Sequence, residues 1–247
     1  MKYPILLLAF TFTMCQSPAE EDQTTGDTAA CRSPAEELLD KTISYHDPEN
    51  RWAEYTADIT QNSRMMREGD DTTLIRTRRI SMDNGRAYFS MEQEADGYTV
   101  RRTVAADSMC MSEWDKPELT AEDSTTMALN CDRAEMMRNY FRYLIGLPMV
   151  LKDEGTQLSD QVASEQLFGQ SYRTLTVNYE GDEPEWTFFI DTTDYRLAAA
   201  RFVKADSTGE YIVFNDEAED KGIRHVGSFY WYYLDKMPLA VEEYTFK

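Results

Sequence analysis

The stretch from Asp132 to Pro148 predicts a helix that is apolar along one side, and it constrains the fold more than any other segment. Its apolar side chains recur at helical spacing, and polar or charged side chains lie between them. The apolar members are Met136, Met137, Tyr140, Phe141, Leu144 and Ile145. Asp132 with Glu135 has the form of a capping box, and Gly146 before Pro148 is typical of a left-handed helix end. A helix of this kind needs a partner surface that covers its apolar side.

Most segments on both sides of this helix show the two-residue period of antiparallel strands. Leu74 to Met82 and Arg86 to Glu94 flank Asp83-Asn84-Gly85, where Asn and Gly favour the positive φ of a tight hairpin. We expect about ten strands in one antiparallel sheet. The predicted fold is α+β: a curled, unclosed half-barrel wrapped around one or two amphipathic helices.

A second helix is predicted to begin at Ser33-Pro34-Ala35-Glu36, with serine as the N-cap and proline at the first helical position. It is expected to end at His46-Asp47-Pro48, because the residue before proline leaves the helical region. The first strand is expected to start at Trp52, with Ala53, Tyr55, Ala57 and Ile59 facing inward and Trp52 facing outward. After the central helix, residues 149–156 are expected to form a strand-like step and a turn.

The amino end predicts export. Residues 5–14 are apolar apart from two threonines, which is too short for a membrane span of about 20 residues but suits a signal peptide over residues 1–14. Cys15 follows at once, as in a bacterial lipoprotein signal that is cut before the cysteine and acylated on it. An ordinary secretory signal, in which Cys15 has no role, is the alternative.

Residues 15–34 are expected to be an acidic flexible tether, and residues 35–247 a single domain. The acidic residues after Cys15 resemble the surface-export signal of Bacteroidota lipoproteins, although simple solubility explains them as well. The whole chain has 25 Lys+Arg against 45 Asp+Glu, a net charge of -20. This charge disfavours nucleic acid as a partner, and it disfavours electrostatic docking to anionic lipid.

The cysteines predict a disulfide rather than a metal site. Cys110 and Cys131 flank the connection into the central helix, and export places them in an oxidising space. Two buried free thiols are the alternative. Cys31 is left unpaired in the tether. The sequence has neither a Cys-x-x-Cys pair nor paired histidines, so no zinc site is expected.

Candidate catalytic residues are few. His46, next to Asp47, could act as a general base in a hydrolase only with a nucleophile within hydrogen-bonding reach. The alternative is a histidine bonded to its own helix cap. His225 has no evident partner. The carboxylate runs at residues 182–185 and 216–220 lack calcium-loop spacing and are expected to be solvated turns. No nucleotide or nucleophile motif is present, so no cofactor and no enzymatic activity are expected.

Several short segments together resemble an uncharacterised family of Bacteroidota lipoproteins, a domain of unknown function, over residues 36–246. They are Glu37-Leu38-Leu39, Tyr45-His46-Asp47-Pro48, Trp52, Cys131-Asp132-Arg133-Ala134, Tyr140 to Pro148, Leu151-Lys152-Asp153, Gly155-Thr156, Asp191 to Phe202 and Glu210-Tyr211-Ile212. Proline is usual in that family where this chain has Glu154, so the turn there is expected to differ. The resemblance implies the architecture of lipoprotein carriers (LolA-like, LppX-like), in which an unclosed antiparallel barrel shelters acyl chains.

Two function hypotheses follow. The first is a non-enzymatic lipoprotein of the outer membrane, at the periplasmic face or the cell surface, that binds a lipid or acyl chain. Its candidate lining is the apolar side of the central helix (Met136, Met137, Tyr140, Phe141, Leu144, Ile145) with Trp231 and Tyr233; plain core is the alternative role. The second is a structural or protein-interaction lipoprotein of the envelope that uses the aromatic strand Phe229 to Tyr233. An empty cavity under the helix favours the first, and a filled interior with exposed aromatics favours the second.

Overall fold

The computed structural model describes residues 32–66, 74–95, 97–106, 109–181 and 184–247. The predicted signal peptide and residues 15–31 of the predicted tether, with Cys15 and Cys31, lie outside these ranges. Residues Arg32–Lys247 form one compact unit. Among the described residues, no helix combines the length and the apolar character that a membrane crossing requires.

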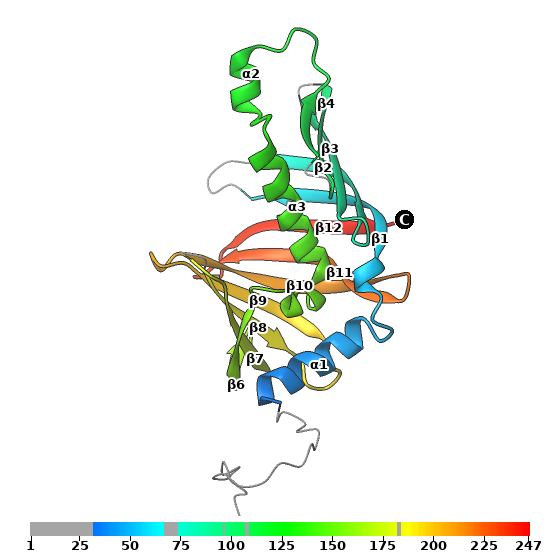
Figure 1. Ribbon diagram of the computed structural model, residues 1–247. Helices are drawn as coiled ribbons and strands as arrows, with labels where there is room; N and C mark the ends of the chain where they lie inside the picture. Colours follow the sequence, from blue (N-terminus) through cyan, green and yellow to red (C-terminus); the bar gives the residue numbers. More distant parts are fainter. Residues whose placement is uncertain (1–31, 67–73, 96, 107–108, 182–183) are drawn as a thin grey trace, which may run out of the picture. The chain divides into compact units, whose positions relative to one another are not determined.

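Twelve strands of the described chain form one antiparallel sheet, in the order β5-β4-β3-β2-β1-β12-β11-β10-β9-β8-β7-β6. The strands are β1 Thr56–Met65, β2 Leu74–Asp83, β3 Tyr88–Ala95, β4 Tyr98–Val104, β5 Cys110–Trp114, β6 Gln157–Leu167, β7 Gln170–Asn178, β8 Glu185–Ile190, β9 Leu197–Val203, β10 Gly209–Asp220, β11 Ile223–Tyr233 and β12 Pro238–Phe246. Strands β5 and β6 are the two ends of this order, so the sheet is unclosed, as predicted (Figure 1).

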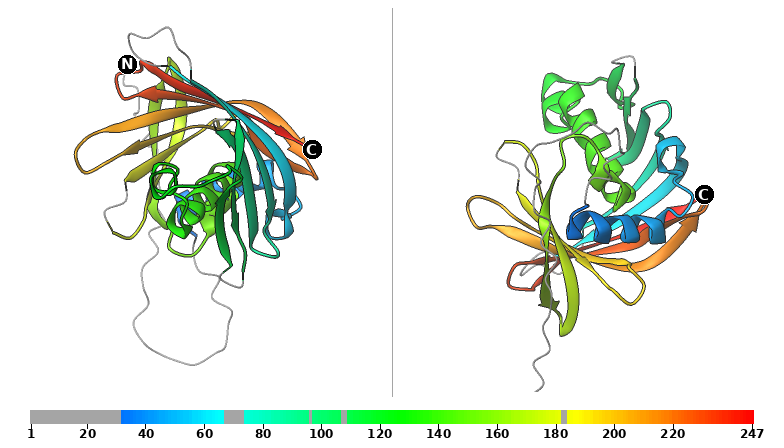
Figure 2. Two further views of the ribbon diagram at one scale, coloured as in Figure 1. Left: turned by 90° about the horizontal axis from the view of Figure 1, so that it is seen from above. Right: turned by 60° about the horizontal axis from the view of Figure 1, so that its bottom comes forward.

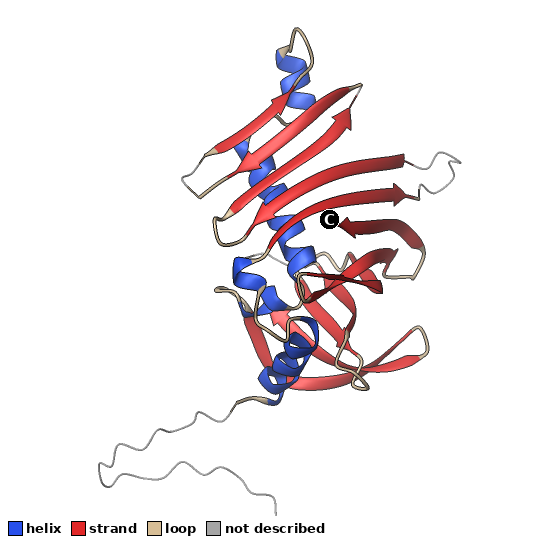
Figure 3. Ribbon diagram, turned by 90° about the vertical axis from the view of Figure 1, so that its right-hand side faces the viewer, coloured by secondary structure: helices blue, strands red, loops and turns tan. Residues whose placement is uncertain are grey.

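The helices are α1 Pro34–His46, α2 Ala121–Thr126 and α3 Cys131–Gly146, with short 3-10 turns η1 Trp52–Glu54 and η2 Met149–Lys152. The sheet curls around α3, and α1 lies on the same side (Figure 2). We call this side the inner face of the sheet. Figure 3 shows α3 running across successive strands. The predicted α+β fold, a curled sheet around amphipathic helices, is therefore confirmed.

The N-cap of α1 is the predicted residue, whereas the N-cap of α3 is not. Ser33 caps α1 in a capping box with Glu36, as expected. The N-cap of α3 is Asn130, whose side chain accepts the backbone N–H of Arg133 at 2.9 Å. The predicted cap at Asp132 is wrong, because Asn130 is the residue with extended backbone while Asp132 is already inside the helix.

Packing explains why the last residue of α3 is Gly146. It keeps helical backbone, and Leu147 after it is extended, so the predicted left-handed end is wrong. A Cβ at Gly146 would overlap the Trp52 ring and lie 2.5 Å from Val150 Cγ1. Glycine is therefore needed here because Trp52 packs directly against the helix backbone.

Four other local predictions need correction. Trp52 lies in η1 and is buried while Ala53 is exposed, the reverse of the prediction, and the first strand begins later, at Thr56. Residues 149–152 form a buried 3-10 turn instead of a strand-like step. Residues 216–220 belong to β10 rather than to a turn. In the β2–β3 hairpin the positive φ falls on Ala87 (48°), not on Asn84 or Gly85.

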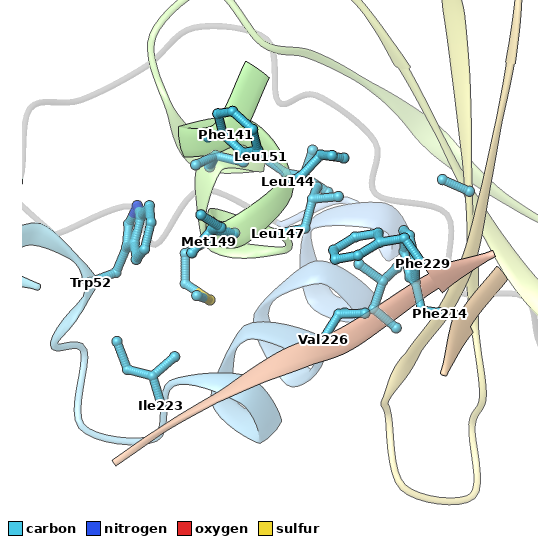
Figure 4. Packing of buried hydrophobic residues seen from close by; sticks show 14 of the residues in the cluster. Trp52, Phe141, Leu144, Leu147, Met149, Leu151, Phe214, Ile223, Val226 and Phe229 are labelled. Carbon is cyan, nitrogen blue, oxygen red and sulfur yellow. The ribbon is translucent and has the colours of Figure 1, made fainter. Parts of the chain in front are cut away.

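The core lies between the C-terminal half of α3, α1 and the inner face of the sheet. Figure 4 shows Phe141 and Leu144 of α3 above Phe229 and Val226 of β11, with Trp52 closing one side. Phe141 also stacks on Phe89 of β3, with ring centres 6.2 Å apart. All of these side chains are at least nine-tenths buried, so the sheet and helix are held by a filled interior here.

Candidate functional site

The predicted lining residues divide into two groups along α3. Phe141, Leu144 and Ile145, toward its C-terminal end, are 1–3% exposed and belong to the core. One turn and more toward the N-terminus, Met136 is 42% exposed, and Met137 and Tyr140 are partly buried. The side of α3 that bears Ala134, Phe141 and Ile145 is therefore covered, and the adjacent side that bears Met136 and Tyr140 is partly open.

The sheet supplies the residues that face the open part of the helix. Trp231 and Tyr233 alternate with Tyr232 along β11, so both lie on the inner face. Trp231 packs against the core, and Tyr233 is 45% exposed. Trp231 pairs with Ala240 of β12. Two residues further along β12, Glu242 accepts a hydrogen bond of 3.0 Å from the Tyr140 hydroxyl. The open part of α3 thus reaches the strands that carry both predicted aromatic residues.

Three further aromatic side chains extend this surface toward β7–β9. Tyr143 follows Tyr140 on α3; its ring centre is 5.4 Å from that of Trp186, which is 5.0 Å from that of Phe202. The Tyr179 hydroxyl donates to the Tyr143 hydroxyl at 3.0 Å. We define the inner aromatic patch as the residues, none fully buried, on the side of α3 that bears Tyr140 and on the inner face of the facing strands. Its members are Met136, Tyr140, Tyr143, Trp186, Phe202, Trp231 and Tyr233.

Tyr143, Trp186 and Phe202 are not among the site residues predicted from the sequence. A signal was available for Tyr143, because residues 136, 140 and 143 lie on one stripe of a helix. For Trp186 and Phe202 no local signal existed, since they face each other only through the pairing of β8 with β9.

A buried carboxylate fastens α3 to the sheet beside the patch. Glu242 is 8% exposed and accepts the hydroxyls of Tyr140 (3.0 and 3.1 Å) and Tyr244 (3.0 Å). Burial raises the pKa of Glu242, while these two hydrogen bonds and the nearby Arg78 charge oppose the rise. Burial and the Glu242 charge hold the pKa of Tyr140 well above its usual value, so its hydroxyl stays a donor. The arrangement positions Tyr140 and thereby the open part of α3.

His46 is not placed to act as a general base. It is 1% exposed; its Nδ1 lies 2.6 Å from the Arg224 carbonyl, and the Leu197 N–H donates to its Nε2 at 3.2 Å. Nδ1 therefore carries the proton, and both nitrogens are used by backbone. Burial lowers the pKa of His46. The hydrolase hypothesis required a nucleophile hydrogen-bonded to the His46 ring, and it fails because both ring nitrogens are bonded to backbone groups.

The cysteine prediction is confirmed. Cys110 and Cys131 form a disulfide with Cα atoms 5.5 Å apart. It ties β5 to the first residue of α3. Over the described ranges, no group of three His, Cys, Asp or Glu side chains is placed to hold a metal ion.

Two surface pockets of the described residues lie away from the inner aromatic patch. One of about 760 Å³ lies over β1–β5 and includes Arg79, Arg101 and Tyr88. Another, of about 320 Å³, lies between the β2–β3 hairpin and the charged side of α3 at Arg138 and Arg142. Neither is lined by a predicted ligand-binding residue.

Similar solved structures place the fold. The LolA superfamily protein NE2245 from Nitrosomonas europaea is 10% identical, with a TM-score of 0.51 over 85% of this chain and 91% of that chain. A DUF1329 family protein from Desulfovibrio piger is also 10% identical, with a TM-score of 0.44 over 86% of this chain and 92% of that chain. No curated protein matches the sequence. The first similarity shows that the fold is LolA-like, as the sequence resemblance implied.

The sequence match to a family covers almost the whole described fold. Residues 27–245 match a family of unknown function, DUF6503. This range holds every helix of the structure and all strands up to the last residues of β12. The predicted resemblance to an uncharacterised family is therefore confirmed, and the chain belongs to the family of unknown function DUF6503.

Proposed function

We propose that this chain is a membrane-tethered, non-enzymatic lipoprotein of the cell envelope whose LolA-like domain binds an apolar ligand, such as a lipid or acyl chain, on the inner aromatic patch. One observation carries the proposal: the side of α3 that bears Met136 and Tyr140 is partly open, while Phe141 and Leu144 beside it are buried. An apolar surface that a fold leaves partly open marks a binding surface for a ligand or a partner. Because the core below is filled, the ligand is expected on the surface of the patch and not in an enclosed cavity.

The chemistry of the patch supports an apolar ligand. Tryptophan and tyrosine rings offer large apolar faces, and methionine adapts its shape to flexible chains. The hydroxyls of Tyr140 and Tyr143 are already bonded to Glu242 and Tyr179, which leaves their rings as the available surface. Because these bonds hold the rings in place, the surface is preformed, and little side-chain entropy is lost when a ligand binds.

The tether is proposed from the sequence alone, since Cys15 lies outside the described residues. The apolar run that ends directly at Cys15 supports acylation of this cysteine and anchoring in the outer membrane. Metabolic labelling with a palmitate analogue is expected to label the wild-type chain and not Cys15→Ala. Equal labelling of both chains would remove the anchor from the proposal.

Ligand binding is testable with a neutral apolar probe. The full chain carrying Cys15→Ala, so that no anchor brings detergent into the assay, is titrated with the fluorescent probe N-phenyl-1-naphthylamine. Met136→Glu is expected to weaken binding at least about tenfold, because a carboxylate on the patch must be desolvated by the probe. Met111→Glu is the matched control: Met111 is 40% exposed against 42% for Met136, but lies on β5 outside the patch.

Two results contradict this proposal. Absence of probe binding to the parent chain rules out an apolar site, and equal losses in Met136→Glu and Met111→Glu rule out its location on the patch. A dissociation constant that Met111→Glu leaves unchanged is the expected outcome.

A protein-interaction role is the second candidate, and one surface favours it. Phe229 is buried, so the predicted aromatic strand does not offer its whole length. However, Tyr232 of β11 lies 5.3 Å, ring centre to ring centre, from Phe168, which is 49% exposed and has Lys236 over its ring at 5.4 Å. Capture of one envelope protein by wild type but not by Phe168→Ser would favour this role, provided that the probe above does not bind.

A further inference from the structure

One carboxylate lies among the aromatic rings of the patch. Glu210 of β10 alternates with the fully buried Ile212, so it points to the inner face. Its register partners on the two neighbouring strands are Phe202 and Tyr233, both members of the patch. Glu210 is partly buried. In the ranges that the structure describes, neither a hydrogen bond nor an ion pair engages its carboxylate.

A cation of the chain already approaches this corner of the patch. The Lys204 ammonium lies 5.9 Å from the centre of the Phe202 ring. Burial raises the pKa of Glu210, and the Lys204 charge lowers it, so the two groups interact electrostatically without forming a close pair. Glu210 also acts on Tyr140 across the patch, since its charge helps to raise the pKa of that hydroxyl. Rings from helix and sheet therefore surround one acceptor-only group.

The charges around the patch are complementary to a cation. The Glu242 charge is already engaged by two tyrosine hydroxyls and the nearby Arg78, so Glu210 is the carboxylate that a headgroup meets. The electron-rich faces of Trp231, Tyr233 and Phe202 attract cations. An anionic headgroup here would be repelled by Glu210. A neutral headgroup would leave the half-buried Glu210 without compensation.

We propose that the inner aromatic patch takes an amphiphile with an ammonium group, seating the cation at Glu210 between Phe202 and Tyr233 and the alkyl chain along Met136 and Trp231. This inference rests on the proposed function, because it names the ligand class for the same site. Lys204 then acts as an internal competitor that an incoming ammonium displaces from the Phe202 ring.

The test compares two probes with the same alkyl chain. The full chain carrying Cys15→Ala is titrated by calorimetry with octyltrimethylammonium and with neutral octyl glucoside. The ammonium probe is expected to bind about tenfold more tightly than the glucoside. Glu210→Gln is expected to remove this preference by weakening the ammonium probe about tenfold. The variant is expected still to bind the glucoside, which reports that it is folded. Lys204→Met is expected to increase the preference.

A matched control is Glu219→Gln, which removes an exposed carboxylate from the far end of the same strand and is expected to change neither affinity. Equal binding of the two probes overturns the ammonium inference and leaves the proposed apolar site intact. A preference that survives Glu210→Gln overturns the role of Glu210. If neither probe binds, the proposed function fails together with the inference.

Discussion

Replacing His225 is expected to remove a defined part of the pH dependence of folding. His225 is fully buried; its Nδ1 lies 3.1 Å from the Ile145 carbonyl at the end of α3, and its ring stacks on Phe246 with centres 4.5 Å apart. Nδ1 therefore donates to the carbonyl, and the ring is neutral. Burial lowers the pKa of His225 from 6.5 to about 4. Protonation consequently favours the unfolded chain.

The sign and size follow from proton linkage. Above the unfolded pKa of 6.5 neither state binds the proton, and the stability is fully present; as the pH falls from 6.5 to about 4, only the unfolded chain takes it up. At 1.36 kcal/mol per pKa unit, the loss at pH 5 is about 2 kcal/mol. His225→Asn keeps an N–H donor for Ile145 and does not titrate. Its stability is therefore expected to lack this loss.

The assay is urea unfolding, followed by tryptophan fluorescence, of wild type and His225→Asn at pH 7.5 and at pH 5. At pH 7.5 the variant is expected to be less stable, because the ring packing is lost. At pH 5 the gap between the two is expected to shrink by about 2 kcal/mol. His46 is present in both proteins, so its own contribution cancels in the comparison. A gap of the same size at both pH values would refute the argument.

Three further stability changes follow from the packing, each measured by urea unfolding. Gly146→Ala is expected to lower the unfolding free energy by about 1–3 kcal/mol, because its Cβ would overlap the Trp52 ring; a gain of about 1 kcal/mol, as helix propensity alone predicts, would contradict this. Replacing Cys110 and Cys131 together by serine is expected to cost about 3 kcal/mol, and an unchanged midpoint would count against the disulfide. Glu242→Leu is expected to cost about 2–4 kcal/mol by leaving two buried tyrosine hydroxyls unpaired, and a stable variant would contradict the assigned hydrogen bonds.

The arrangement of the sheet was largely predictable because alternation records which strand faces are buried. Strand β6, which the alternation does not predict, shows the limit of this argument. It has one fully buried residue, Leu167, at its end, so a two-residue period hardly marks it. It lies at the edge of the sheet and needs little burial, and its backbone pairing with β7 is what makes it a strand.

The candidate site was only partly predictable, for a geometric reason. The apolar stripe of α3 shows which side of the helix faces the sheet, but not how close the sheet lies at each turn. Met136 and Tyr140 are four residues apart on the same side of the helix, yet Met136 is 42% exposed and Tyr140 is partly buried. Similarly, nothing local marks Glu210 as a member of the patch, because strand pairing across β9, β10 and β11 brings it between two rings.

Native mass spectrometry of the wild-type chain, gently extracted from its own membranes, tests the central claim most directly. The account predicts a population that carries a non-covalent lipid-sized ligand in addition to any acyl anchor, and it predicts that Met136→Glu, but not Met111→Glu, loses that ligand. A wild-type chain that is consistently free of ligand, or a ligand that Met136→Glu retains in full, would contradict the account.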